Sequence, residues 1–186
     1  MEPAESLREE HALIARMLEV LDTFVGTVET GGRENRHDLV LLVTFFREFA
    51  DLVHHEKEEG LVLPALVRAG MSWEDGTLDS VRKDHNMERY LMQSLRHASL
   101  QSREWSPDNR RHLSEVARSF TTFMRRHIAK EEATLIPALE QRLDPAATDT
   151  LRTRMQRFDA RFRDSGEAEV MQSLAHELWV RYGSPE

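Results

Sequence analysis

Two copies of one short pattern carry the residues best suited to chemistry. His54 and Glu58 lie four positions apart, as do His127 and Glu131, and a proline follows each pair after the same interval. On a helix, residues four positions apart lie one turn above each other on nearly the same face. Each pair therefore offers one imidazole and one carboxylate to a single point. Two such helices facing each other predict a site for two metal ions.

Two further histidines complete an internal repeat. His11 precedes His54, and His85 precedes His127, by nearly the same interval, and both lie in the apolar stripe of a predicted helix. A lone histidine in such a stripe is usually a core residue that is satisfied by local hydrogen bonds. Burying all these ionisable groups without a cation would carry a large desolvation cost, which favours metal binding. The predicted metal ligands are His11, His54, Glu58, His85, His127 and Glu131.

The helical frame around the first pattern separates inward from outward residues. On an α-helix, His54 and Glu58 continue an apolar line, whereas His55 and Glu59 continue a line that contains Asp51. We therefore expect His55 and Glu59 to flank the site on a solvated face.

Hydrophobic periodicity predicts an all-α fold. Apolar residues recur at steps of three and four along four helices in residues 1–143 and two more in residues 144–186. The related halves of the first region predict an up-and-down four-helix bundle with the ligands in its core. Residues 144–186 are expected to be a helical extension packed on the bundle, within a single domain, or to form a dimer contact.

Prolines mark several helix boundaries. Ser106-Pro107 and Asp144-Pro145 each place a helix-capping residue before a proline at the first helical position, so a helix is expected to begin at each. Pro64 lacks an N–H and would clash with a carbonyl of the preceding turn, so it predicts a kink or an early helix end after the first pattern.

Composition limits the possible chemistry. The chain has no cysteine, which excludes disulfides, thiolate metal sites and all-cysteine iron–sulfur clusters. Imidazole and carboxylate ligands suit iron or manganese, and also zinc. The formal charge of -8 argues against general nucleic-acid binding. No apolar run is long enough to cross a bilayer and no secretory signal is visible, so we expect a cytoplasmic protein without membrane contact.

Over roughly residues 7–143, these motifs make the sequence similar to the hemerythrin-like, HHE cation-binding family. The resemblance implies a four-helix bundle that holds two non-haem iron ions, bridged by oxo or carboxylate groups. It implies that the four histidines are terminal ligands and that Glu58 and Glu131 are bridging ligands. Oxygen carriers of the family have a further histidine where this chain has Arg89. The chain is more similar to the branch with four histidines and two glutamates.

The resemblance also implies a function. It favours a protein that binds or reacts with O2, peroxide or NO, in oxidative or nitrosative stress or in iron handling. The alternative is a reversible O2 carrier, or a sensor module that passes a signal to a partner. A third hypothesis is a helical interaction protein whose site holds zinc or nothing. The expected partners are small diatomic ligands or peroxide, and a second copy of the chain bound through the C-terminal helices.

Overall fold

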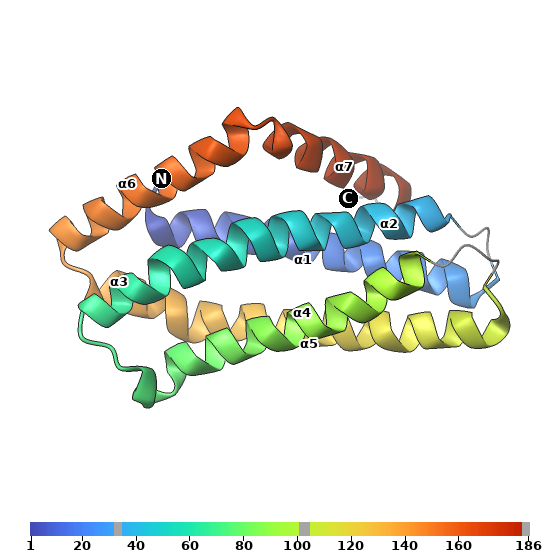
Figure 1. Ribbon diagram of the computed structural model, residues 1–186, viewed down its shortest axis with the longest axis horizontal. Helices are drawn as coiled ribbons and strands as arrows, with labels where there is room; N and C mark the ends of the chain where they lie inside the picture. The colour runs from blue at the N-terminus through green and yellow to red at the C-terminus, as the bar shows by residue number, and fades with distance from the viewer. Residues whose placement is uncertain (32–34, 101–104, 184–186) are drawn as a thin grey trace.

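The computed structural model describes residues 1–31, 35–100 and 105–183, and within these ranges it contains helices and no strand. Four long helical rods run along the molecule in alternating directions, and two shorter helices cover one side (Figure 1). The prediction of an all-α, up-and-down four-helix bundle with two additional C-terminal helices is confirmed. Among the described residues, no helix combines the length and the apolar character needed to cross a membrane.

The rods follow the order of the chain. Three of them are single helices: α1 (Pro3–Glu29), α4 (Thr77–Ser99) and α5 (Pro107–Arg142). The second rod is composite and consists of α2 (Arg36–Phe45), η1 (Phe46–His55), η2 (Glu58–Val62) and α3 (Leu63–Arg68). A short 3-10 helix, η3 (Trp73–Asp75), leads into α4.

Both predicted helix starts are confirmed. The Ser106 hydroxyl accepts a hydrogen bond from a backbone N–H three residues on, and Pro107 opens α5. The Asp144 carboxylate does the same before Pro145, which opens α6 (Pro145–Asp164). The side chains satisfy donors that the first helical turn leaves free, and the prolines lack a donor there.

The second rod contains two π-helical segments, in which backbone N–H groups bond five residues back. The Glu56 N–H bonds to the Asp51 carbonyl at the end of η1, and the Leu63 N–H bonds to the Glu58 carbonyl at the end of η2. Such segments change which side chains share a face. The helix does not end at Pro64, because α3 continues to Arg68 directly after the π-helical turn of η2.

The last two helices, α6 and α7 (Glu167–Tyr182), pack on α1 and on the composite rod (Figure 1). Leu151 and Met155 of α6 and Leu178 of α7 are buried in these contacts. The end of α7 is also held by polar contacts, because Arg181 and the Tyr182 hydroxyl both bind the buried carboxylate of Asp38.

Apolar side chains form two separate layers along the bundle. One layer contains Ile14, Phe46 and Phe120, and the other contains Leu7, Leu66 and Leu135. On every rod the buried histidines and glutamates fall between the residues of the two layers. The fold therefore encloses a polar centre between two water-excluding layers.

Candidate metal centre

The six predicted ligands meet in that polar centre, and all are buried. One group of potential ligand atoms comes from His11, His54, Glu58 and Glu131, and a second from Glu58, His85, His127 and Glu131. Within each group, the ligand atoms lie within 4.8 Å of one another. The rods thus bring together two histidine pairs that share two carboxylates.

The two shared carboxylates face the Nε2 atoms of the histidines. Oxygens of Glu131 lie 3.2 Å from His11 Nε2, 3.3 Å from His127 Nε2 and 3.6 Å from His85 Nε2. Oxygens of Glu58 lie 3.3 Å from His85 Nε2 and 3.9 Å from His54 Nε2. Each carboxylate therefore reaches a histidine of both pairs.

Many of these inward-facing atoms have no hydrogen-bond partner within the protein. They include Nε2 of His54, His85 and His127, both oxygens of Glu58 and one oxygen of Glu131. A buried polar atom without a partner costs about 1–3 kcal/mol, so a convergent set of them is unfavourable unless something else binds it. Two cations held by imidazole nitrogens and carboxylate oxygens fit this donor set.

The outward-facing nitrogens of two histidines are held by the residues that follow the shared glutamates. His11 Nδ1 lies 2.6 Å from Glu132, and His85 Nδ1 lies 2.7 Å from Glu59. A carboxylate on the outer nitrogen orients a metal-binding imidazole and selects the tautomer with its free nitrogen toward the metal. Glu59 flanks the site as expected, with its side chain 26% exposed.

A buried lysine extends this outer ring on one side. His54 Nδ1 lies 2.9 Å from Glu10, which also binds the ammonium of Lys57. Lys57 is completely buried, and its second carboxylate partner is Asp159 of α6, at 2.6 Å. The chain of contacts from His54 to Asp159 therefore joins the centre to the C-terminal helices.

The other half of the repeat has a similar but more open arrangement. His127 Nδ1 lies 3.5 Å from Asp84, and Asp84 binds the ammonium of Lys130. The side chain of Lys130 is 30% exposed, and its remaining contact is with Ser80. Lys130 matches Lys57 in the sequence repeat. Aligning the two copies therefore identifies both lysines, but it does not show which carboxylates they bind.

The expectation that His55 lies on a solvated face is wrong. His55 is completely buried, and its potential ligand atom lies within 4.8 Å of those of His85 and His127. An α-helical frame rotates His55 away from the core, but η1 is π-helical up to this residue, and His54 and His55 both face inward. The four remaining histidines are exposed: His37, His97, His112 and His176.

Arg89 lies beside the centre and pairs with carboxylates. Its guanidinium binds Asp51 at 2.7 Å and Glu59 at 2.9 Å. Glu59 in turn holds His85, so Arg89 supports a candidate ligand through one intermediate residue. Its side chain is 31% exposed.

Electrostatics within the centre give the metal-free protein a distinctive pH dependence. Burial alone would lower the pKa of His11, but the carboxylates of Glu131 and Glu132 on α5 and of Glu58 on η2 outweigh it and raise that pKa to about 9. The His54 ring of η1 faces His11 at 4.8 Å between ring centres. His11 is thus protonated at neutral pH when no metal competes for its nitrogens.

We expect the metal-free protein to lose stability as the pH rises from about 6.5 to 9. The pKa of His11 is raised on folding from 6.5 to about 9, so its stabilisation is complete below pH 6.5 and is lost as the pH passes 9. The expected loss is on the order of 1–3 kcal/mol in the free energy of unfolding, measured by urea titration at both pH values. His85 acts in the same direction, because Glu131, Glu58 and Glu59 outweigh its burial and raise its pKa to about 11. His11→Gln should therefore remove roughly half of the dependence between pH 6.5 and 9, and an unchanged slope in that variant would contradict the assignment.

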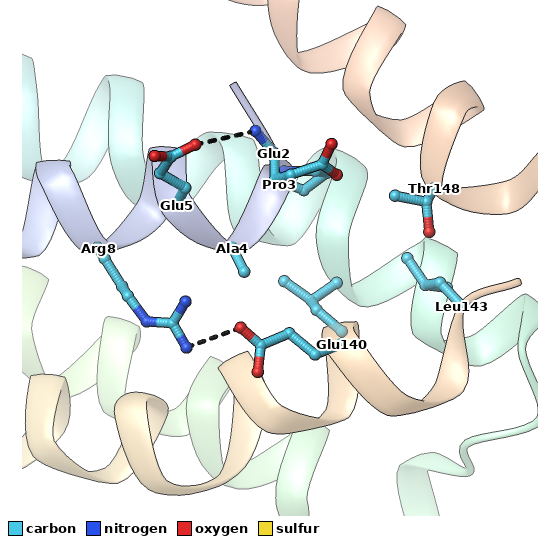
Figure 2. Close-up of a pocket in the computed structure, with 9 residues that line it drawn as sticks. Glu2, Pro3, Ala4, Glu5, Arg8, Glu140, Leu143 and Thr148 are labelled. Carbon is cyan, nitrogen blue, oxygen red and sulfur yellow. Dashed lines mark hydrogen bonds and ion pairs between the residues drawn. The ribbon is translucent and has the colours of Figure 1, made fainter. Parts of the chain in front are cut away.

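A surface pocket of about 520 Å³ lies apart from the centre, where the start of α1, the end of α5 and the start of α6 meet (Figure 2). Arg8 and Glu140 form an ion pair there at 2.8 Å. None of the residues lining the pocket is a histidine. The pocket therefore lacks the donor set of the polar centre.

Comparison with known proteins agrees with this geometry. The model of the hemerythrin HHE cation-binding domain matches residues 2–139. Searches among curated proteins and among solved structures find no match. The matched span reaches from α1 into the last turns of α5 and includes both patterns that carry a histidine and a glutamate four positions apart. With most of its length covered by that match, the chain belongs to the hemerythrin HHE cation-binding domain family.

Proposed function

We propose that this chain binds two iron ions in the polar centre and reacts with O2, peroxide or NO, in oxidative or nitrosative stress or in iron handling. The observation that carries the proposal is the pair of histidine groups that share Glu58 and Glu131 in a buried layer. His11 and His54 would hold one ion, and His85 and His127 the other. The same donors accept manganese or zinc, so the test begins with metal content.

The shared glutamates have two tasks in this proposal. Glu58 and Glu131 would offset part of the charge of two divalent cations in a region that excludes water. A carboxylate can also move between bridging two cations and binding one, which opens a position for a small ligand. When bound, the ferrous pair would supply electrons to such a ligand.

The outer carboxylates and the apolar layers prepare the site. Glu132, Glu10 and Glu59 would keep the Nδ1 atoms of their histidines protonated and turn the Nε2 atoms inward. The two apolar layers limit access by bulk water and favour small uncharged ligands over large ones.

We also infer that residues 1–143 form the metal-binding part and that residues 144–186 are an extension of it. The inference is supported by the composition of the centre, because all the candidate ligands come from α1, η1, η2, α4 and α5.

A second candidate function is reversible O2 binding in a sensor that passes a signal to a partner. It is favoured by the contacts that run from His54 through Glu10 and Lys57 to Asp159. Through these contacts, a change at the metal could reach the surface that α6 contributes.

The deciding experiment is to load the protein with iron(II) without O2, measure iron per chain, and follow the visible spectrum as O2 is admitted and removed. A reactive centre predicts a lasting spectral change, and peroxide and NO consumption would then be assayed. A change that reverses when O2 is removed would favour the sensor. Iron content below one ion per chain would contradict both.

A further inference from the structure

His55 has the environment of a ligand rather than of a packed core residue. Its ring stacks on that of His85, with 4.1 Å between ring centres and 18° between ring planes. It lies edge-on to the ring of His127, at 5.4 Å. The three rings bring one potential ligand nitrogen each within 4.8 Å of the others.

The hydrogen bonding of His55 is incomplete. Neither of its ring nitrogens has a hydrogen-bond partner in the protein, although the imidazole is completely buried. Glu88 lies closest, with one oxygen 3.1 Å from Nε2, and that oxygen is also without a hydrogen-bond partner. The carboxylate of Asp51 is 3.9 Å from Nδ1. A buried imidazole and carboxylate without partners are costly unless a further group binds them.

The internal repeat shows that this pair is specific to one half of the centre. Because His54 matches His127 in the repeat, Ile128 takes the place that corresponds to His55. Because His85 matches His11, Ile14 takes the place that corresponds to Glu88. One half of the centre therefore has an extra imidazole and carboxylate, whereas the corresponding positions of the repeat are two isoleucines that pack in an apolar layer.

We propose that His55 is a third histidine ligand of the ion held by His85 and His127, with Glu88 beside it as a positioning residue or a further oxygen donor. This inference rests on the proposed binding of two iron ions. It makes the two ions chemically different, with three histidines on one and two on the other.

The test compares wild-type protein with the double variant His55→Ile, Glu88→Ile, which copies the isoleucines of the other half. Both proteins are loaded with 57Fe(II) without O2, iron per chain is measured, and Mössbauer spectra are recorded. The wild type should give two quadrupole doublets of equal area, one from each ion. The variant should keep its iron while its two doublets converge. The matched control is His97→Gln, an exposed histidine of α4, which should match the wild type.

Other outcomes separate this inference from the function on which it rests. Two ions that give a single doublet in the wild type, or unchanged doublets in the double variant, would overturn the role of His55 alone. Less than one iron per chain in the wild type would overturn the proposed function as well. If the double variant does not fold, His55→Gln, which keeps an uncharged polar side chain, is judged by the same convergence of doublets. A change of equal size in His97→Gln would overturn the assignment.

Discussion

Replacing Glu131 by glutamine is expected to reduce iron binding from about two ions to less than one per chain. The oxygens of Glu131 face His11 on one side and His85 and His127 on the other, so both potential ligand groups include this residue. Glutamine keeps the size of the side chain but removes the negative charge that would offset the cations. Iron per chain after anaerobic loading and desalting measures the effect.

The same variant should abolish stabilisation by iron. A metal that binds only the folded state at a concentration of 1,000 Kd stabilises it by about 4 kcal/mol. For a protein of this size, roughly 2–4 °C of Tm corresponds to each kcal/mol, so each bound iron ion should raise the wild-type Tm by roughly 8–16 °C. Comparing each protein with and without iron removes any effect of the substitution on the metal-free fold.

Glu132→Gln is the matched control for this prediction. Glu132 is the next residue along α5, but it contacts only the outer nitrogen of His11 among the candidate ligands, and its side chain is 35% exposed. It should weaken iron binding by about 10–100-fold, as expected for a group that orients a ligand, and leave two ions bound at high iron concentration. Equal loss in both variants would contradict a bridging role for Glu131.

The four-helix bundle could be predicted largely from the repeated pattern and from the helix periodicity. Residues four apart on a helix share a face whatever the rest of the fold, so the sequence alone places His54 with Glu58, and His127 with Glu131. The capping residues Ser106 and Asp144 act through their own neighbours, and both helix starts followed from local sequence.

The buried position of His55 could not be predicted from the sequence. An unbroken α-helical frame from Phe46 to His55 turns His54 inward and His55 outward. The bond from the Glu56 N–H to the Asp51 carbonyl widens the turn, and adjacent histidines then both face the core. The adjacent His-His pair is itself a signal, because an α-helix cannot direct both residues fully inward, but it does not reveal which frame the helix adopts.

The contacts of Glu10 and Asp84 could not be predicted for a different reason. Glu10 and Asp84 directly precede the histidines His11 and His85 in the sequence, yet each holds a histidine of another rod. Such contacts depend on the rotation and axial position of whole helices, which periodicity does not determine. Asp159 is still more remote, since its contact with Lys57 requires α6 to fold back over the bundle.

Lys57→Met is expected to lower the free energy of unfolding of the metal-free protein by about 3–5 kcal/mol, the usual cost of removing one partner from a buried ion pair. The ammonium of Lys57 is completely buried between Glu10 and Asp159, and methionine fills its volume without its charge. Two carboxylates then remain close together without a cation. Urea unfolding followed by circular dichroism measures the loss.

Lys130→Met is the matched control, because Lys130 occupies the same place in the repeat but is 30% exposed. Water can solvate the Asp84 carboxylate in place of the ammonium, so a loss of about 1 kcal/mol or less in the free energy of unfolding is expected. Adding Asp159→Leu to Lys57→Met removes one of the stranded carboxylates and should recover part of the stability, which a double-mutant cycle would show as coupling. Equal small losses in the two lysine variants, without such recovery, would mean that Lys57 does not join α6 to the metal centre.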